Sequence, residues 1–343
     1  MKWKFAVGNP PYQQESKGAN ANDTPVYQHF YDAAYEIADK VELISPARFL
    51  FNAGGTSKDW NDKMLNDEHF KVLNFTQKSS DIFANTSITG GIAITYHDAQ
   101  KTFGKIGVYT PFECLNTIKE KVLSFNEPSL MDSVTNRGLY RYSDDAYKDY
   151  PDEMKKTADK RIAPSCFERM NNIFIDNDPH SDEYIRIFGN YNGQRIYKWI
   201  KKIYVTDVEN LHKYKVLVPK ANGSGAIGEK EQTMMIGTPI IAEPMVGFTE
   251  TYISVGESYN FCEVEATYKY LKTKFVRALI GILKITQNNA KPVWQYVPSQ
   301  NFAANAEIDW TKSVQEINQK LYDKYGLTKE EIDFIETHVK EMD

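Results

Sequence analysis

The sequence predicts an α/β fold, in which part of a doubly wound sheet is followed by an α+β region. Apolar runs typical of buried strands alternate with helical patterns over about the first hundred residues. After Pro111 the pattern changes to a polar stretch and then to shorter, β-rich segments. With 343 residues, of which 25% are charged and 13% aromatic, the chain is long enough for about two folded domains.

The first predicted element is a short strand. Residues 4–8 form an apolar run that ends at Asn9, where the sequence Asn-Pro-Pro-Tyr excludes both a helix and a central strand. Thr24 can cap a helix that has Pro25 at its first position. Apolar residues then recur with the helical period as far as Ala38, so we expect a helix over this stretch.

Three further strands are expected in the first region. VELISP at 41–46 is a buried strand, and ARFLF at 47–51 starts a helix that the following glycines end. HFKVLNFT at 69–76 and GGIAITYHD at 90–98 complete the set. The last run is continuously apolar, as in a strand that is covered on both faces. Strands and helices in this alternating order describe half of a doubly wound sheet.

The remainder of the chain has a different pattern. Residues 124–165 are polar and irregular, and the stretch SDDAYKDYPDEMKKTADKR at 143–161 is expected to be solvated. The segments over 185–302 are short and β-rich, and one helix over 263–285 interrupts them. Near the carboxyl end Gly326 separates two short helices, and Thr328 caps the second. We therefore predict three regions, at residues 1–123, 124–305 and 306–343.

The composition excludes several classes of site and location. The three cysteines are far apart and the six histidines are scattered, so we expect neither a disulfide framework nor a metal site. No apolar run has the length of a membrane span, and Met1 leads directly into a short strand, which together favour the cytoplasm. Because the net charge is −5, a nucleic-acid partner would have to bind a local basic face.

The loop Asn9-Pro10-Pro11-Tyr12 offers a specific chemistry. The amine of adenine is a poor nucleophile because its lone pair is delocalised into the ring, and acceptors for both of its protons return electron density to the nitrogen. The Asn9 side chain and the Pro10 carbonyl can accept these protons, and Pro11 fixes the backbone. Tyr12 can stack on a purine, a contact worth about 1–3 kcal/mol. On these residues alone, an ordinary proline-rich turn explains the sequence equally well.

The context of this loop resembles a known family, the gamma-class N6-adenine DNA methyltransferases of type II (type IIG-like) restriction–modification systems. GNPPYQ resembles their catalytic motif, and VELISPARFL resembles the strand and helix that follow it. SDIFANTSITGGIAITYHD is similar to their late pair of motifs. Later stretches, among them YKVLVPKANGSG, GTPIIAEP and VWQYVP, resemble the target-recognition half. The resemblance covers nearly all of the chain.

The resemblance implies a Rossmann-like methyltransferase sheet followed by a DNA target-recognition domain. The implied reaction moves a methyl group from S-adenosyl-L-methionine to the N6 amine of an adenine that is flipped out of double-stranded DNA. Asn9, Pro10, Pro11 and Tyr12 are the implied catalytic residues. Tyr96, an aromatic residue near the end of the last strand of the first region, is the implied second wall of the base pocket.

The cofactor-binding motifs of that family do not precede the catalytic loop here. In the family a Phe-x-Gly-x-Gly loop and an acidic strand end lie upstream, whereas this chain begins just before the strand FAVG. By resemblance the chain is the carboxy-terminal portion of a longer enzyme, as a split subunit, the product of an internal start or a disrupted gene. We expect it to bind S-adenosylmethionine weakly or not at all, and to need an upstream chain for activity.

Two alternatives remain open. A Gly-x-Gly-x-x-Gly pattern at Gly223, Gly225 and Gly228 would give a permuted, complete methyltransferase with a downstream cofactor loop. Against it, the next segment is short for a crossover helix, and the strand does not lead tightly into the glycines. Lys220 and Asn222 then belong to a DNA-contacting or plain surface loop. The second alternative is a DNA-binding specificity module without catalysis.

Lysines on two predicted elements are further candidates for DNA binding. They are Lys198, Lys201 and Lys202 in YKWIKKIYV, and Lys272 and Lys274 on the helix over 263–285. Contact with phosphates would make binding depend on salt. An ordinary solvated face explains the same charge pattern without a ligand.

Overall fold

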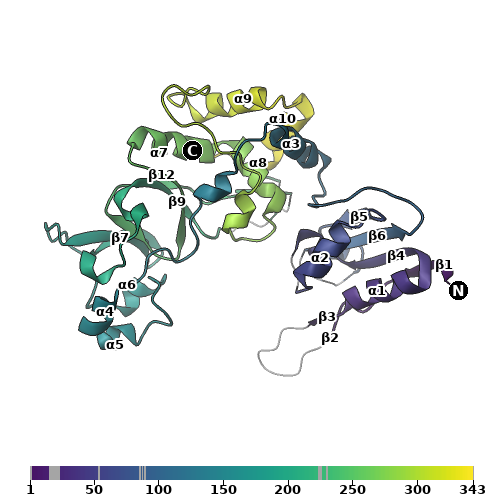
Figure 1. Cartoon of the computed structure of the whole chain (residues 1–343), viewed down its shortest axis with the longest axis horizontal. Coiled ribbons are helices and arrows are strands. Elements are labelled where there is room, and N and C mark those ends of the chain that lie inside the picture. The colour runs from purple at the N-terminus through teal and green to yellow at the C-terminus, as the bar shows by residue number, and fades with distance from the viewer. Residues whose placement is uncertain are drawn as a thin grey trace. The chain divides into compact units, whose positions relative to one another are not determined.

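The computed structural model describes residues 2–14, 24–52, 55–84, 86, 88, 90–222, 226–228 and 231–342. The chain forms two compact units, Met1–Glu113 and Cys114–Asp343 (Figure 1). The predicted boundary at residue 123 falls within the helix α3 (Glu113–Ser124). The predicted carboxy-terminal region belongs to the second unit.

The first unit is built on a four-stranded sheet. Its strands, in spatial order, are β1 (Trp3–Gly8), β4 (Ala38–Pro46), β6 (Ile92–Asp98) and β5 (Phe70–Thr76) (Figure 1). β1 and β4 are parallel, whereas β6 is antiparallel to both of its neighbours. The four predicted strands are therefore present, but the sheet is mixed rather than parallel as in a doubly wound fold.

Helix α1 (Tyr27–Ile37) connects the two parallel strands. It begins later than predicted because Thr24 and Pro25 form the short strand β3 (Thr24–Pro25), which pairs with β2 (Gln13–Gln14). Val26 is consequently the N-cap residue, and no side chain caps the helix. The segment from β1 through α1 to β4 is the kind of crossover that a parallel pair requires.

Two helices follow β4. The ARFLF stretch forms the 3-10 helix η1 (Ala47–Phe51) instead of an α-helix. The helix α2 (Lys58–Leu65) comes next and was not predicted, although the hydroxyl of its N-cap residue Ser57 accepts a hydrogen bond from the Trp60 amide at 3.2 Å. A short 3-10 turn, η2 (Ser79–Asp81), lies between β5 and β6.

The core of the first unit is rich in aromatic residues. The rings of Phe49 and Trp60 have centroids 5.2 Å apart, and the Tyr31 ring lies 5.8 Å and 5.7 Å from them. Val41 and Leu43 of β4 are buried in the same core. Tilted and edge-to-face contacts of this kind add to the stabilisation that burial provides.

Strand β1 is an edge strand whose side chains have two environments. Ala6 packs against the core, whereas Trp3, Phe5 and Val7 on the opposite face are 72%, 61% and 75% exposed. The outer backbone edge of β1 pairs with no other strand of the described residues. The first unit therefore presents an uncovered apolar edge.

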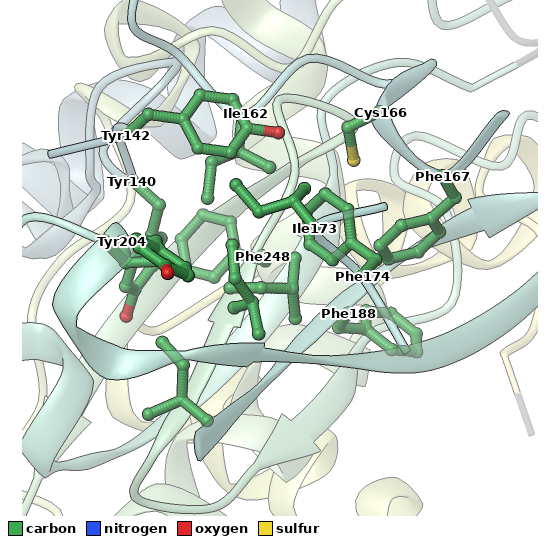
Figure 2. Packing of buried hydrophobic residues seen from close by; sticks show 14 of the residues in the cluster. Tyr140, Tyr142, Ile162, Cys166, Phe167, Ile173, Phe174, Phe188, Tyr204 and Phe248 are labelled. Atoms are coloured by element: carbon green, nitrogen blue, oxygen red, sulfur yellow. The ribbon is translucent and has the colours of Figure 1, made fainter. Parts of the chain in front are cut away.

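The second unit begins with short helices, the last three of which contribute residues to an apolar cluster. These are α3 (Glu113–Ser124), η3 (Leu130–Ser133), α4 (Asp144–Asp149), α5 (Pro151–Met154) and α6 (Cys166–Arg169). The prediction that residues 143–161 are solvated is partly wrong, because Ala146 and Met154 are buried in the cluster. Tyr140, Tyr142 and Ile162, which flank this stretch, are buried there as well (Figure 2). A stretch of mixed polarity can thus supply core residues singly.

Two three-stranded sheets form the middle of the second unit. The first consists of β11 (Val246–Phe248), β7 (Tyr184–Tyr191) and β8 (Gln194–Lys201), and the second of β10 (Ile240–Ala242), β9 (Tyr214–Pro219) and β12 (Tyr252–Ser258). The short 3-10 helices η4 (Lys202–Tyr204) and η5 (Glu209–His212) lie between β8 and β9. Phe167, Phe174 and Phe188 pack in the apolar cluster beside the sheet formed by β11, β7 and β8 (Figure 2). The predicted β-rich character of this region is confirmed.

The predicted helix over 263–285 consists of two helices. α7 (Phe261–Lys272) ends before Thr273, and α8 (Lys274–Leu283) begins after it. The Thr273 hydroxyl caps α8 by accepting a hydrogen bond from the Val276 amide at 3.3 Å. Apolar periodicity cannot reveal this break, because apolar residues continue on both sides of it.

The carboxyl end follows the prediction. After the 3-10 helix η6 (Lys291–Trp294), the chain forms α9 (Val314–Lys324) and α10 (Lys329–His338). Thr328 caps α10, and each of the two helices begins with a capping box, in which the N-cap hydroxyl and a glutamate exchange hydrogen bonds with the backbone.

Candidate active site

Three segments lie at one edge of the first sheet. β1 is parallel to β4, so Gly8 and Pro46 end their strands at the same edge. Because β6 is antiparallel to β4 and β5 is antiparallel to β6, Ile92 and Thr76 lie opposite Pro46. The edge therefore carries the residues that follow β1, the helix η1, and the segment 77–91 between β5 and β6.

The loop Asn9–Tyr12 leaves the sheet at this edge. Asn9 and Pro11 are exposed, Pro10 is buried and Tyr12 is half-buried. The Tyr12 carbonyl accepts a hydrogen bond from the Val26 amide at 3.1 Å, and the pairing of β2 with β3 continues this attachment. The loop is therefore fixed at both ends, and the Pro10 carbonyl accepts no hydrogen bond from the described residues.

The Tyr12 side chain lies beside Asn9 and close to the aromatic core. Burial raises the pKa of the Tyr12 phenol, and the nearby Asn9 side chain lowers it by a smaller amount. The phenol also acts electrostatically on Tyr31, one of the buried core tyrosines. Tyr12 is therefore neutral near pH 7, and its ring lies beside Asn9.

A buried polar network lies in the sheet behind the loop. The Tyr31 hydroxyl contacts the Ser45 hydroxyl at 2.9 Å and the Thr95 hydroxyl at 2.7 Å. Thr95 also donates to the Leu43 carbonyl at 3.2 Å, and Ser45 is completely buried. The network joins α1, β4 and β6, so it fixes the strand ends next to the loop.

The structure does not bring Tyr96 to the loop. Tyr96 lies opposite Glu42 of β4, which lies opposite Val7, so it is level with the next-to-last residue of β1 and two strands away from it. Its hydroxyl donates to Asp98 at 3.1 Å, and its ring lies 5.9 Å from Phe103. The prediction placed Tyr96 at the loop because it lies near the end of its strand, whereas β6 is antiparallel to β4 and ends away from the Asn9 edge.

Phe83 is an aromatic residue that the sequence analysis missed. It is half-buried and lies in the segment 77–91, at the same edge as Asn9. The Ser79 hydroxyl closes this segment by donating to the Thr86 carbonyl at 3.1 Å and accepting from the Ile88 amide at 2.8 Å. Phe83 belongs to the stretch SDIFANTSITGGIAITYHD quoted in the sequence analysis. Knowing that the next strand, β6, is antiparallel would have placed this stretch, rather than the end of β6, at the Asn9 edge.

The described residues do not form a dinucleotide-type cofactor loop after β9. Gly223 and Gly225 lie outside the described residues, and Gly228 adopts a left-handed conformation with φ of 85°. β9 is antiparallel to both β10 and β12, and residues 231–239 form no helix. A dinucleotide loop joins a strand of a parallel sheet to a helix, so this topology contradicts the permuted arrangement.

Three of the candidate DNA-binding lysines are engaged within the protein. Lys198 is buried, forms an ion pair with Asp176 at 2.9 Å and lies 4.5 Å from the centre of the Tyr191 ring. Lys274 is buried and pairs with Glu336 at 2.6 Å. Lys272 is buried as well. These lysines have structural partners or little exposure, which contradicts their predicted role in DNA contact.

The other candidates differ in their accessibility. Lys202 is exposed and lines a surface hollow with Arg186 and Trp199, and Lys201 is half-buried. Both amide groups of Asn222 are used internally, because its nitrogen donates to the Met234 carbonyl and its oxygen accepts from Lys284. Lys220 is half-buried at the end of β9.

The described parts of the chain contain neither a metal-binding cluster nor a membrane-spanning helix. No group of three or more histidine, cysteine, aspartate or glutamate side chains there could hold a metal ion. No helix in the same parts is long and apolar enough to cross a membrane.

Comparison with known proteins gives one family match. Residues 1–83 match the model of the Eco57I restriction-modification methylase family. A search of curated proteins finds no match. The fold is also similar to a solved structure of the type IIL restriction-modification enzyme MmeI in complex with DNA, with a TM-score of 0.43 and 10% identity. That alignment covers 97% of this chain and 56% of the other, so the chain spans about half the length of that enzyme.

The family match coincides with the candidate site. Residues 1–83 contain β1, β4, β5 and the loop Asn9–Tyr12, together with Phe83 at the last matched position. The part of the chain that is similar to a restriction-modification methylase is therefore the part that carries the proline-rich loop.

Proposed function

We propose that the chain is the catalytic-loop and DNA-recognition portion of a site-specific DNA methyltransferase that methylates the N6 amine of adenine, with S-adenosylmethionine as the methyl donor. The observation that carries this proposal is the loop Asn9–Tyr12 at the end of a strand in a parallel pair, within the stretch matched by a methylase family. Ligand sites of open α/β sheets commonly lie beyond the carboxyl ends of their strands.

In this proposal the loop activates the target amine by accepting its protons. The exposed Asn9 side chain accepts one amine proton, and the Pro10 carbonyl, which has no acceptor role within the described residues, accepts the other. The fixed φ of Pro11 holds that carbonyl in place. Electron density then returns to the amine nitrogen, and the work of the protein is positioning and electrostatics.

Two aromatic residues would hold the flipped base. The half-buried Tyr12 provides one face, because its neutral ring lies beside Asn9. We assign the second face to Phe83 in place of Tyr96, since the segment 77–91 lies at the edge where β1 ends. Stacking on an aromatic ring is worth about 1–3 kcal/mol per base.

The described residues do not fit a complete site for S-adenosylmethionine. The topology around β9 contradicts a cofactor loop there, and the loop Asn9–Tyr12 offers acceptors for an amine rather than a cradle for the cofactor. We assign the cofactor site to residues outside this sequence, in a preceding segment or a partner chain that pairs with β1. The open backbone edge of β1 and the exposed Trp3, Phe5 and Val7 beside it support this assignment.

The product formed in DNA tests the proposed reaction. The chain is produced in a bacterial host without DNA adenine methylation, alone and together with the polypeptide encoded directly upstream. Nucleosides from the digested DNA are then analysed by mass spectrometry. We expect N6-methyladenine only in the combined experiment, and none with Asn9→Ala. N4-methylcytosine would contradict the choice of base, because cytosine carries a similar amine.

A second candidate function is a DNA-binding specificity module without catalysis, because the described residues do not fit a complete cofactor site. The antiparallel pairing of β9 favours it, since a cofactor loop of the dinucleotide type follows a strand of a parallel sheet. Sequence-selective DNA binding without any methylated base, with or without the upstream polypeptide, would establish that function instead.

A further inference from the structure

A buried carboxylate in the second unit holds two guanidinium groups. The Glu250 side chain is only 5% exposed, and it accepts hydrogen bonds from Arg137 through Nε at 3.0 Å and Nη2 at 3.3 Å. Arg161 Nη1 lies 2.8 Å from the same carboxylate, and Asp159 binds the rest of the Arg161 guanidinium. The two-point pairing fixes the plane of the Arg137 guanidinium and leaves its Nη1 edge available.

A glycine permits this arrangement. Gly138 has a φ of 72°, and a Cβ atom there would lie 2.4 Å from Arg161 Cδ and 3.0 Å from Glu250 Oε1. No side chain can be accommodated without displacing the Arg161 stem. Arg137 therefore supplies one guanidinium, and Gly138 leaves the space in which the Arg161 side chain reaches Glu250.

A third cation lies beside this pair without a partner of its own. The Lys220 amide donates to the carbonyl of Thr251, the residue after Glu250, at 2.8 Å. The Lys220 ammonium is half-buried and makes no hydrogen bond or ion pair with the residues that the structure describes. Burial and the charges of Arg137 and Arg161 lower the pKa of Lys220, whereas Glu250 raises it.

The local charges leave an excess of positive charge at Lys220. Three cations, Arg137, Arg161 and Lys220, face two carboxylates, Glu250 and Asp159, and the carboxylates are bound to the arginines. A half-buried ammonium near two like charges is unfavourable in the free protein. An anion that bridges Lys220 and the free edge of Arg137 would remove this repulsion.

We propose that Arg137 and Lys220, oriented by Glu250, bind a phosphate group of the DNA backbone. This assignment rests on the proposed function, because it is DNA that brings a phosphate to the second unit. Arg161 acts as a positioning residue, since its donors are occupied by Glu250 and Asp159. The contact fixes the position of the duplex but reads no sequence.

The experiment measures the salt dependence of DNA affinity for the full chain. A labelled mixed-sequence duplex is titrated with the unchanged chain and with Lys220→Met, and binding is followed by fluorescence anisotropy between about 50 and 200 mM salt. We expect Lys220→Met to weaken binding several-fold and to reduce the slope of log K against log salt by about 0.9. We also expect Arg137→Met to weaken binding. The thermal midpoint of Lys220→Met should be equal or higher, because an unpaired charge is removed.

The matched control is Lys155→Met. Lys155 is also a lysine of the second unit, its side chain is 76% exposed, and it pairs with Asp152 at 2.7 Å, so its removal makes the same change in net charge at a different place. We expect Lys155→Met to change neither affinity nor slope. Equal effects of the two variants would overturn the site, because net charge alone would then explain them.

Four further outcomes are decisive. Unchanged binding by Lys220→Met, with a duplex that binds the unchanged chain, overturns this site alone. A fall in the thermal midpoint together with lost binding overturns it as well, since it shows a structural lysine. Saturable binding of inorganic phosphate at constant ionic strength, abolished by Lys220→Met while duplex binding persists, assigns the site to a free anion. No duplex binding by the unchanged chain counts against the proposed function itself.

Discussion

The two units treat their apolar strands differently. In β1 of the first unit, Trp3, Phe5 and Val7 are 61–75% exposed, whereas in β9 of the second unit Val216, Leu217 and Val218 are completely buried. β9 is a central strand with neighbours on both sides, and among the described residues β1 has a neighbour on one side only. The contrast indicates that the second unit has a complete core, while the first presents a surface that another strand and its covering helix would bury.

This difference matters for the proposed reaction. The loop Asn9–Tyr12 follows the open strand β1, so a partner that pairs with β1 would end beside the loop if it ran parallel to that strand. Exposed apolar edge strands favour pairing with other chains. The same feature that leaves the first unit open would thus bring a cofactor site next to the amine acceptors.

The largest expected effect is the loss of stability when a buried phenylalanine, rather than an exposed one, is replaced by alanine. Phe167 is completely buried in the core of the second unit (Figure 2), and Phe5 on β1 is 61% exposed. We expect Phe167→Ala to lower the free energy of unfolding of the second unit by about 3–5 kcal/mol, because it leaves a cavity. Phe5→Ala should change that of the first unit by about 0.5 kcal/mol or less. Denaturant titration measures both; similar losses would show that β1 is covered in the protein.

A buried lysine should make the stability of the second unit depend on alkaline pH. Lys215 is completely buried, and burial lowers its pKa to about 7, with Glu257 opposing the change. Between about pH 7 and 10.4 the unfolded state binds more protons at this lysine, so stability rises with pH by up to about 1.4 kcal/mol per unit. In Lys215→Met this contribution should be absent. Equal pH dependence of both proteins between pH 7 and 9 would contradict it.

The polar network of the first unit should have an intermediate effect. Tyr31→Phe removes the hydroxyl that contacts both Ser45 and Thr95. We expect it to lower the free energy of unfolding of the first unit by about 1–3 kcal/mol, because buried polar groups lose a hydrogen-bond partner. The exposed-ring substitution Tyr259→Phe, in the second unit, is a suitable control. An unchanged thermal midpoint of Tyr31→Phe would mean that the network contributes nothing to the first unit.

The sequence predicted the elements of the molecule better than their directions. The four strands of the first sheet and the capping residue Thr328 of α10 were predicted correctly, because apolar runs and capping residues are local signals. The antiparallel direction of β6 was not predicted, because strand pairing depends on distant residues. For this reason Tyr96 was chosen from the sequence, whereas the strand directions lead us to propose the loop residue Phe83 as the second aromatic of the site.

Charges were the other limit of the prediction. Lys198 and Lys274 look like surface lysines in the sequence, yet both are buried and paired. Lys220 was correctly placed in a loop beside a strand, but its neighbours Arg137 and Glu250 are distant in the sequence. Which cation is already neutralised depends on tertiary contacts, so a charge pattern alone cannot separate them.

The smallest expected effect is acid sensitivity of the first unit. Burial lowers the pKa of His97, although Asp67 raises it, and the ring stacks on Tyr35 with centroids 4.0 Å apart. As the pH falls, the histidine is protonated in the unfolded state before it is protonated in the folded state. The contribution of His97 to stability is therefore complete above about pH 6.5 and is lost as the pH falls below that value. His97→Phe should flatten this dependence between about pH 6.5 and 5. A steeper dependence in the variant would reverse the assigned sign.

The most direct test of the central claim uses Asn9→Ala in the enzyme reconstituted with its upstream partner. Methyl transfer and DNA affinity are measured on the same preparations. The account predicts that turnover falls by about 10²–10³-fold, because one acceptor of the amine is lost, while the DNA dissociation constant is unchanged. Equal losses of turnover and affinity, or full turnover, would contradict it.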